Sequence, residues 1–279
     1  MAGKLEDQVA FVTGAARGQG RSHAVRMAAE GADIIAVDRC ADLESVNYGL
    51  ATEADLDETC ALVEAQGRKV VRHVADVRDL AALTAAVEDG VGRFGRLDIA
   101  VANAGIASYG AGADLTEQQW DEMIDVNLSG VWRTARVAIP HIRAGGRGGC
   151  ILMTSSVAGL RGIPHAAHYA ASKHGVVGLV KVLALELGAE GIRVNAIHPT
   201  NVNTGMIRND ATVELFLPNP DKPRTEEAFA RIAQQLNVLP VPWIEPEVVS
   251  ETVVFLASEA GKYITGASIP VDAGMSQRW

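Results

Sequence analysis

A chain of 279 residues that is 48% hydrophobic and 21% charged, with 28 glycines, has the composition of a globular protein with many tight turns. Its 25 basic and 34 acidic residues give a net charge of −9 and form no cationic run, so a nucleic-acid partner is not expected. No apolar stretch approaches the roughly 20 residues that a membrane helix needs, and the opening sequence enters a strand pattern at once, so we expect a cytoplasmic protein without a membrane partner.

Seven short apolar runs rich in β-branched residues alternate with helical patterns along the chain. The runs predict strands over 9–12, 33–37, 69–74, 97–101, 150–153, 193–197 and 267–271. The helical patterns cover 20–30, 53–66, 80–92, 118–143, 169–188 and 246–257. Nearly continuous apolar strands separated by helices indicate a parallel sheet covered on both faces. The sequence therefore predicts a doubly wound α/β fold, with residues 1–279 forming a single domain.

Two segments break this alternation. After the second strand, about fifteen residues intervene before the next helix, within the segment 39–56, which is long for such a connection. Residues 200–246 contain six prolines together with Phe216, Leu217 and Trp243. A proline-interrupted segment of this length is typical of a mobile lid or substrate loop. An ordinary surface or subunit-contact excursion is the alternative.

A glycine-rich turn follows the first strand and opens the first helix, with the sequence TGAARGQG. Gly14, Gly18 and Gly20 permit close backbone approach, and the exposed N–H groups and the helix dipole favour an anion such as a dinucleotide pyrophosphate. The spacing differs from the G-x-G-x-x-G fingerprint, and no Gly-Lys-Ser/Thr follows as in a P-loop. Packing alone is the alternative reason for such a turn.

An acidic residue, Asp38, ends the second predicted strand. At this place a carboxylate can accept hydrogen bonds from the adenosine ribose hydroxyls and would repel a 2′-phosphate, which favours NAD over NADP. Arg17 and Arg39 could offset that repulsion. Solvated surface charge is the alternative interpretation of both arginines.

Tyr169 and Lys173 lie four residues apart in a helical pattern, so both project from one face. A nearby ammonium favours phenolate and lowers the tyrosine pKa from its usual value of about 10. The pair could therefore provide the acid and base of an alcohol–carbonyl interconversion. Ser156 follows the fifth strand and could polarise a substrate oxygen in the same crevice. Each of these patterns taken singly is commonly structural; a serine after a strand is often a helix cap.

Several motifs occur together in an order that resembles the short-chain dehydrogenase/reductase family, over essentially the whole chain. They are TGAARGQG, ANAG (102–105), VNLSG (126–130), Ser156 with Tyr169 and Lys173, and HPT (198–200). The resemblance implies a Rossmann-type, seven-stranded parallel sheet with helices on both faces. It also implies an NAD-dependent alcohol dehydrogenase or carbonyl reductase.

The same resemblance implies roles for four catalytic residues. Tyr169 would donate or accept the proton while hydride passes to or from nicotinamide, and Ser156 would orient the substrate oxygen. Lys173 would lower the pKa of Tyr169 and bind the nicotinamide ribose. Asn127 would support a water-linked proton relay.

The cofactor contacts implied by the resemblance follow the carboxyl ends of the strands. Asn103 would stabilise the central sheet near the cofactor, and Asp76 would lie by the adenine. His198-Pro199-Thr200 stands where the family more often has Pro-Gly. The expected NAD contacts are Gly14, Arg17, Gly18, Gln19, Gly20, Asp38, Arg39, Cys40, Asp76, Val77, Asn103, Ala104, Gly105, Tyr169, Lys173, Pro199, Thr200, Val202 and Thr204.

A narrower resemblance is to the mycofactocin-coupled branch of the family, which includes carveol dehydrogenase-like enzymes. It rests on the insertion at 39–56 and on the sequences NVLPVPWIEP (237–246) and ITGASIPVDAGM (264–275). It implies a non-exchangeable NAD reoxidised by a redox carrier, a homotetramer, and a hydrophobic secondary alcohol or its ketone, such as a terpenoid, as substrate. The insertion would be a flap over the adenosine half of NAD, with Cys40 and Tyr48 facing inward. A surface insertion that touches nothing is the alternative.

Other functions remain as alternatives. A non-catalytic dinucleotide-binding regulator would need the glycines but not the Ser, Tyr, Lys and Asn set, and a different carbonyl substrate, such as a 3-oxoacyl or steroid compound, would use the same residues. A hydrolase using Ser156 lacks a G-x-S-x-G elbow and evident His and Asp partners. His165 and His168 lack a third ligand, so no metal site is predicted. The three cysteines are predicted to be reduced thiols.

Overall fold

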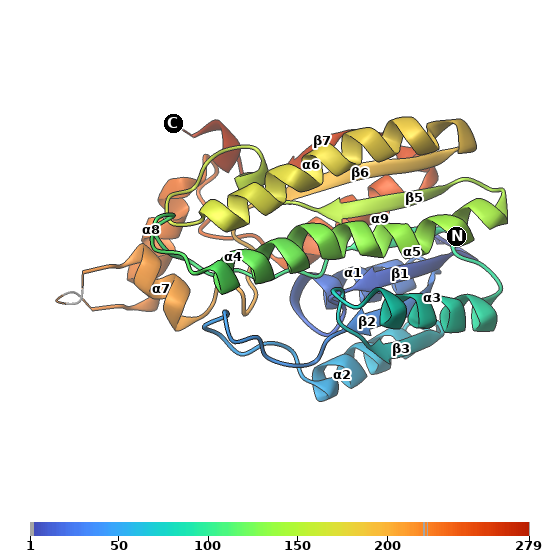
Figure 1. The fold of residues 1–279 in the computed structure, drawn as a ribbon, viewed down its shortest axis with the longest axis horizontal. Helices are drawn as coiled ribbons and strands as arrows, with labels where there is room; N and C mark the ends of the chain where they lie inside the picture. Colours follow the sequence, from blue (N-terminus) through green and yellow to red (C-terminus); the bar gives the residue numbers. More distant parts are fainter. Residues whose placement is uncertain (1–2, 220, 222, 279) are drawn as a thin grey trace.

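The computed structural model describes residues 3–219, 221 and 223–278. A seven-stranded parallel sheet with the order β3-β2-β1-β4-β5-β6-β7 forms its centre (Figure 1). The predicted doubly wound, Rossmann-type fold of a single domain is confirmed. The strands are β1 (Val9–Thr13), β2 (Asp33–Asp38), β3 (Val70–Val74), β4 (Ile99–Ala102), β5 (Gly149–Thr154), β6 (Ile192–Pro199) and β7 (Ser268–Val271).

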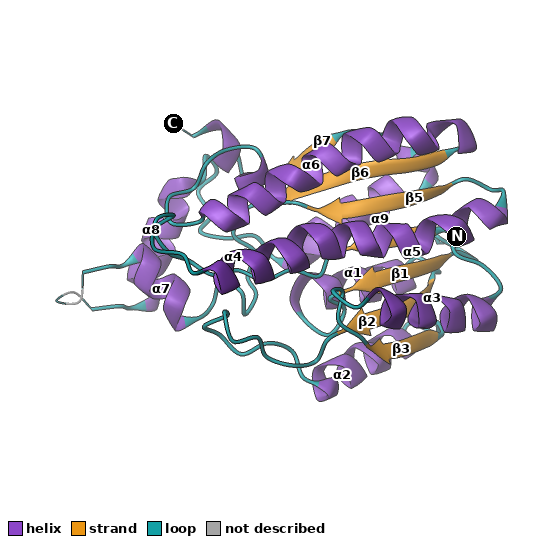
Figure 2. Cartoon of the chain, in the orientation of Figure 1, coloured by secondary structure: helices purple, strands orange, loops and turns teal. Residues whose placement is uncertain are grey.

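Helices cover both faces of the sheet, as Figure 2 shows in purple against the orange strands. None of the helices in the described residues is long and apolar enough to cross a bilayer. The helices are α1 (Gly18–Ala29), α2 (Glu53–Glu64), α3 (Leu80–Phe94), α4 (Glu117–Ile124), α5 (Gly130–Gly145), α6 (Ala167–Leu187), α7 (Asp210–Phe216), α8 (Glu226–Leu236) and α9 (Pro246–Ala257).

The core consists of two apolar layers because successive residues of a strand point to opposite faces of the sheet. In β1, Val9 and Phe11 pack in the layer formed with α3, α5 and α6. Ala10 and Val12 pack in the layer formed with α1, α2 and α9. All five residues of β1 are buried, which explains why its sequence is an unbroken apolar run ending in Thr13.

The prediction of one continuous helix over 118–143 is wrong. It is divided into α4 and α5 by a π-helical turn, Asp125–Ser129. In this wider turn the side-chain amide of Asn127 is bound to the main chain of Ile106: its Oδ1 accepts from the N–H and its Nδ2 donates to the carbonyl oxygen, both at 2.9 Å. π-helical turns occur mostly as single turns inside α-helices, and the contact partner of this one lies in a distant loop.

The segment 200–246 contains two helices that the sequence analysis did not predict, α7 and α8. Asn209 and Thr225 cap their N-termini by accepting from the N–H groups of Thr212 and Ala228. Figure 1 shows both helices at the end of the molecule toward which the strand arrows point. The segment therefore lies over the carboxyl edge of the sheet, where the loops after the strands also gather.

Candidate active site

Two cavities lie along the carboxyl edge of the sheet and share Gln19, Asn103, Gly105 and Thr204 in their walls. We name them the glycine-turn cavity, about 150 Å³ and lined by the turn after β1, and the tyrosine cavity, about 140 Å³ and lined by Tyr169. Because they share walls, a single extended ligand can occupy both.

The glycine turn is shaped so that only glycine fits at two of its positions. Gly14 has φ +69°, and a Cβ there would lie 2.8 Å from the Cα of Ala104. A Cβ on Gly20 would overlap the carbonyl oxygen of Gly14. Asn103 fixes the same turn by donating its Nδ2 to the carbonyl oxygen of Thr13 at 3.1 Å. These contacts bring the start of α1 directly to the cavity wall.

The N-terminus of α1 offers free hydrogen-bond donors to the cavity. Within the described chain no side chain caps this helix, and Gly18, Gln19 and Gly20 of its first turn all line the cavity. The Oε1 of Gln19 is buried without a partner among the described residues. An uncapped helix N-terminus bordered by glycines fits the diphosphate of a dinucleotide, because N–H groups and the helix dipole both favour an anion.

Asp38 lies at the other end of the glycine-turn cavity. Its Oδ2 accepts from the N–H of Ala16 at 3.1 Å, and its Oδ1 accepts from the N–H of Cys40 at the same distance. The carboxylate is therefore fixed in direction, and each oxygen retains a lone pair for a further donor. Such a carboxylate suits two neighbouring ribose hydroxyls and disfavours a phosphate.

Asp76 and Arg39 form an ion pair in the same wall. The Nε of Arg39 lies 3.0 Å from Asp76 Oδ2, and Arg78 lies 2.8 Å from the same oxygen. Partial burial raises the pKa of Asp76, but the hydrogen bonds from Arg78 and the charges of Arg78 and Arg39 outweigh it and hold the pKa below its ordinary value. Arg39 is thus held at the cavity wall, and its Nη1 is buried without a partner within the described chain.

The insertion after β2 also lines the glycine-turn cavity. The Nη2 of Arg17 donates to the carbonyl oxygen of Gly49 at 2.6 Å, and the N–H of Ala107 donates to the hydroxyl of Tyr48 at 3.2 Å. Leu43, in the same loop, is buried and lines the cavity. The alternative of an insertion that touches nothing is therefore wrong.

Cys40, in contrast, does not line either cavity. Its backbone has φ +53°, with the N–H held by Asp38, and its side chain packs against the apolar layer of α1, α2 and α9. The structure thus corrects the expectation that Cys40 faces the cofactor site. The backbone of Cys40 is left-handed, and only this conformation would have shown that Cys40, unlike Tyr48, does not line the cavity. The sequence does not show it.

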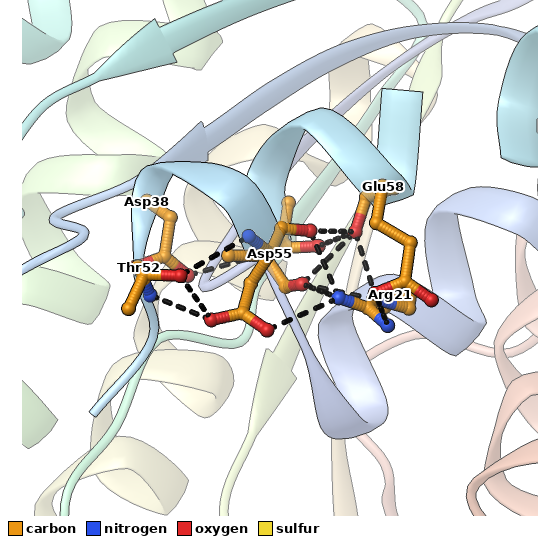
Figure 3. Close-up of polar contacts among 8 residues, drawn as sticks. Arg21, Asp38, Thr52, Asp55 and Glu58 are labelled. Atoms are coloured by element: carbon orange, nitrogen blue, oxygen red, sulfur yellow. Dashed lines mark hydrogen bonds and ion pairs between the residues drawn. The ribbon is translucent and has the colours of Figure 1, made fainter. Parts of the chain in front are cut away.

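The end of the insertion is joined to the glycine turn through α2. Thr52 caps this helix and forms a reciprocal pair of hydrogen bonds with Asp55. Arg21 of α1 forms ion pairs with Asp55 and with Glu58, at 3.6 and 2.7 Å, and donates to the carbonyl oxygen of Ala16 (Figure 3). Both ends of the insertion are therefore fixed to the chain that carries Gly14 and Gly18.

Tyr169, Lys173 and Ser156 meet in the tyrosine cavity. The Nζ of Lys173 lies 5.6 Å from the ring centroid of Tyr169 and donates to the carbonyl oxygen of Thr154 at 2.9 Å. Ser156 caps a short helical turn by accepting from the N–H of Ala158 at 3.2 Å, the structural role considered from sequence, and still lines the cavity. One helix face and one strand end thus assemble the predicted triad.

Burial dominates the ionisation of this triad. It raises the pKa of Tyr169 to about 12, although the facing Ser156 hydroxyl acts in the opposite direction, and it lowers the pKa of Lys173 to about 8. The expectation that the pKa of Tyr169 is lowered is therefore wrong for the protein without NAD, in which this pKa is raised. The reason is that both groups lose their hydration in the same apolar surroundings.

The buried lysine has a consequence for stability that can be measured. Between about pH 8 and its ordinary value of 10.5 the unfolded chain binds more protons at Lys173 than the folded chain does, so this residue makes the free energy of unfolding rise with pH. The difference in unfolding free energy between wild type and Lys173→Met should therefore shift in favour of wild type from pH 8 to pH 10. Denaturant titrations at several pH values measure it. Exposed Lys181 on the same helix supplies the control Lys181→Met, and a flat difference for Lys173→Met would contradict the prediction.

Asn127 lies beneath the site rather than on its surface. It is fully buried, lines neither cavity, and has its amide committed to Ile106. A Cβ added to Gly105 would lie 3.3 Å from Asn127 Oδ1 and 3.6 Å from Lys173 Nζ, which places Asn127 close to the lysine. The water-linked relay through Asn127 stays a prediction.

The remaining expected contacts fall into the two cavities. The Nε2 of His168, one of the two histidines considered as metal ligands, lies 2.8 Å from Ser108 Oγ, and no group of three metal ligands occurs among the described residues. The glycine-turn cavity is lined by Gly14, Arg17, Gly18, Gln19, Gly20, Asp38, Arg39, Asp76, Val77, Asn103, Ala104, Gly105 and Thr204. The tyrosine cavity is lined by Ser156, Tyr169, Lys173, Pro199, Thr200 and Val202.

Most residues of the apolar wall of the tyrosine cavity could not be predicted from the sequence. This wall is built from single side chains of the lid segment, the loop before α6 and the C-terminal turn. No local motif marks them, since each is an ordinary apolar residue whose position is set by tertiary packing. They are Ile163, Ile207, Leu215, Leu236 and Met275, and Phe216, which was named from the sequence, lines the same wall.

Comparison with known proteins agrees with this geometry. A family model described as enoyl-(acyl carrier protein) reductase matches residues 14–276. Over 272 residues the chain is 54% identical to the (−)-trans-carveol dehydrogenase of Rhodococcus erythropolis, covering 97% of this chain and 98% of that protein. The chain belongs to the short-chain dehydrogenase/reductase family.

Solved structures of other short-chain dehydrogenases extend the match to the whole fold. Carveol dehydrogenase from Mycobacterium avium, in complex with NAD, superimposes with a TM-score of 0.97 at 49% identity, covering 99% of this chain and 100% of that one. A short-chain dehydrogenase from Mycobacterium paratuberculosis, bound to NAD, gives 0.91 at 47% identity with the same coverage. The predicted resemblance to the carveol dehydrogenase-like branch is confirmed.

Proposed function

We propose that this short-chain dehydrogenase/reductase uses NAD to interconvert a hydrophobic secondary alcohol, of terpenoid size and character like carveol, and its ketone. The observation that carries the proposal is the position of Tyr169, Lys173 and Ser156. They lie where an apolar cavity joins a cavity lined by a glycine turn and an uncapped helix N-terminus. The relatives named carveol dehydrogenase, one of them an NAD complex, support the substrate class and the cofactor.

The residues of the glycine-turn cavity fit NAD. The start of α1 would bind the diphosphate, and Asp38 would accept from the adenosine ribose hydroxyls. Lys173, with its Nζ near the shared wall at Gly105, would bind the nicotinamide ribose. When bound, NAD supplies the nicotinamide ring that accepts the hydride from the carbinol carbon.

The proton is handled by the chain itself. Ser156 donates a hydrogen bond to the substrate oxygen, and Tyr169 takes the hydroxyl proton as the carbonyl forms, or returns it in the reverse direction. The Lys173 ammonium stabilises the phenolate that this step requires, since burial alone raises the pKa of Tyr169 to about 12. Asn127, close to Lys173, supports the passage of the proton to solvent.

A substrate comparison tests the proposed function. In single turnovers of the protein loaded with NAD, (−)-trans-carveol and other cyclic secondary alcohols should give reduced nicotinamide, detected by its absorbance, with a higher second-order rate constant than short polar secondary alcohols. The apolar cavity predicts this order, because each buried CH₂ group contributes about 0.8 kcal/mol of binding. A preference for short polar alcohols, or for thioester-linked 3-oxoacyl substrates over all terpenoids, would contradict it.

We propose further that the segment 39–56 is a flap that retains NAD between turnovers, so that a redox carrier such as mycofactocin reoxidises it in place. The bonds from Arg17 to Gly49 and from Ala107 to Tyr48, together with the buried Leu43, support this role. They fix the flap to both the glycine turn and the loop after β4. The residues 200–246 would correspondingly act as the lid over the substrate.

Removal of the Tyr48 side chain should loosen the flap. Tyr48→Ala loses the hydrogen bond from Ala107 and the ring that lines the cavity, so bound NAD should dissociate about tenfold faster. The nucleotide that remains after gel filtration, extracted and quantified, measures this. Asn47→Ala, at an exposed position of the same segment that does not line the glycine-turn cavity, is the control and should retain NAD as wild type does. Equal retention in both variants would contradict the flap.

We propose that the chain assembles as a homotetramer. Exposed apolar side chains on the outer helices support an extended subunit contact, among them Trp120 on α4, Trp132 on α5 and Leu185 on α6. Light scattering on the eluting species measures the assembly directly. A monomer at micromolar concentration would contradict it.

A further inference from the structure

Three consecutive residues at the end of β5, Thr154 to Ser156, are held at their positions by different groups. The carbonyl oxygen of Thr154 accepts from Lys173 Nζ at 2.9 Å, and the hydroxyl of Ser155 donates to the carbonyl oxygen of Lys173 at 2.9 Å. The carbonyl oxygen of Ser156 instead lies 2.8 Å from Nδ1 of His198 on β6. Lys173 of α6 therefore fixes Thr154 and Ser155, whereas the side chain of His198 on β6 fixes Ser156.

Ser156 needs an external restraint because the sheet no longer provides one. The paired register of β5 with β6 ends at Thr154 opposite Ile197, and the last ladder bond is donated by the N–H of Ser155. Beyond it, the Ser156 hydroxyl accepts from the N–H of Ala158 and faces Tyr169, and the Ser156 carbonyl oxygen accepts from the N–H of Gly159. The contact with His198 ties this turn to β6.

Among the described residues, the side chain of His198 makes this contact and no other hydrogen bond. The side chain is fully buried, lines neither cavity, and its Nε2 has no hydrogen-bond partner among the described residues. A carbonyl oxygen can only accept, so Nδ1 carries the proton in this pair. Burial lowers the pKa of His198, and the nearby Lys173 charge acts in the same direction, although the Ser156 carbonyl opposes it, so the ring is neutral with the proton on Nδ1.

We infer that His198 is a positioning residue of the reaction: by donating from Nδ1 to the Ser156 carbonyl oxygen, it fixes the direction of the Ser156 hydroxyl in the tyrosine cavity. The inference rests on the proposed function, since it concerns the group that holds the substrate oxygen. A displacement of about 1 Å at such a group costs up to about 100-fold in rate. His198 touches neither substrate nor cofactor and acts through Ser156 alone.

The test compares two replacements of His198. Asn can present its Nδ2 donor near the place of Nδ1, whereas Leu fills similar volume without a donor. His198→Leu should lower kcat by about 10- to 100-fold with KM for NAD unchanged, and His198→Asn should restore most of the rate. Equal losses in the two variants, or an unchanged rate in His198→Leu, would overturn the inference.

Two further measurements keep the result decisive. In a Ser156→Ala background, His198→Leu should cause no additional loss of kcat, because the hydroxyl that His198 positions is gone; a full additional loss would overturn the inference.

The second measurement is the NMR spectrum of the unmodified chain labelled with ¹⁵N-histidine. The signal that is missing from the spectrum of His198→Asn belongs to His198, and it should be that of a neutral ring with its proton on Nδ1. A proton on Nε2 would overturn the inference even if Leu prevents folding. Because this spectrum needs no turnover, it separates a failure of the inference from a failure of the proposed function.

Discussion

Replacing Tyr169 with Phe should lower kcat by about 10²- to 10⁴-fold while leaving the affinity for NAD near its wild-type value. The substitution removes only the phenolic oxygen, and Lys173 keeps its bond to the Thr154 carbonyl oxygen, so the wall that would bind the nicotinamide ribose is preserved. Single-turnover kinetics of the NAD-loaded protein with a cyclic secondary alcohol measures the rate, and the nucleotide retained after gel filtration measures the binding of NAD.

A matched control exists on the surface of the same chain. Tyr263 is 90% exposed, and Tyr263→Phe makes the same chemical change without touching the site. It should retain the wild-type kcat. If Tyr169→Phe also retained most of the activity, the assignment of Tyr169 as the acid and base would be wrong.

Replacing Asp38 with Asn should weaken NAD binding by about 10- to 100-fold and reduce the preference for NAD over NADP. A hydrogen bond to a charged group contributes about 1.5–3 kcal/mol, and the amide retains one acceptor oxygen in place of two. The repulsion of a 2′-phosphate by the carboxylate is lost in the same change, while Arg39 stays beside the site. Dissociation constants for both nucleotides measure the two effects.

The control for this change is a distant carboxylate. Asp114 is exposed, so Asp114→Asn alters the net charge equally without touching either cavity. It should leave both dissociation constants unchanged. An unchanged ratio of NAD to NADP affinity in Asp38→Asn would show that this residue does not select the cofactor.

Much of the fold and part of the site could be predicted from the sequence because their signals are local. The buried strands are apolar runs, since a parallel sheet covered on both faces needs apolar residues at every position, and β1 is such a run. The glycine turn is likewise local, because the close approaches at Gly14 and Gly20 exclude any side chain. Tyr169 and Lys173 share a helix face through their spacing alone.

The remaining features depend on contacts between distant segments. At the π-helical turn Asn127 is bound to Ile106 of a distant loop, and Cys40 packs against an apolar layer with its backbone in a left-handed conformation. The direction of the pKa shift at Tyr169 was wrong from sequence because pairing with Lys173 was considered without the burial that both side chains share. The spacing of two residues in the sequence does not show how deeply their side chains are buried.

The most direct test of the proposed function is a single-turnover experiment on the protein as purified, after any bound nucleotide has been extracted from a separate sample and identified. Mixing the protein, loaded with NAD, with (−)-trans-carveol should produce the absorbance of reduced nicotinamide in an amount equal to the bound NAD, and Tyr169→Phe should produce none in the same time. Absence of reduced nicotinamide in the wild type with every hydrophobic secondary alcohol tried, or an equal yield from Tyr169→Phe, would contradict the account.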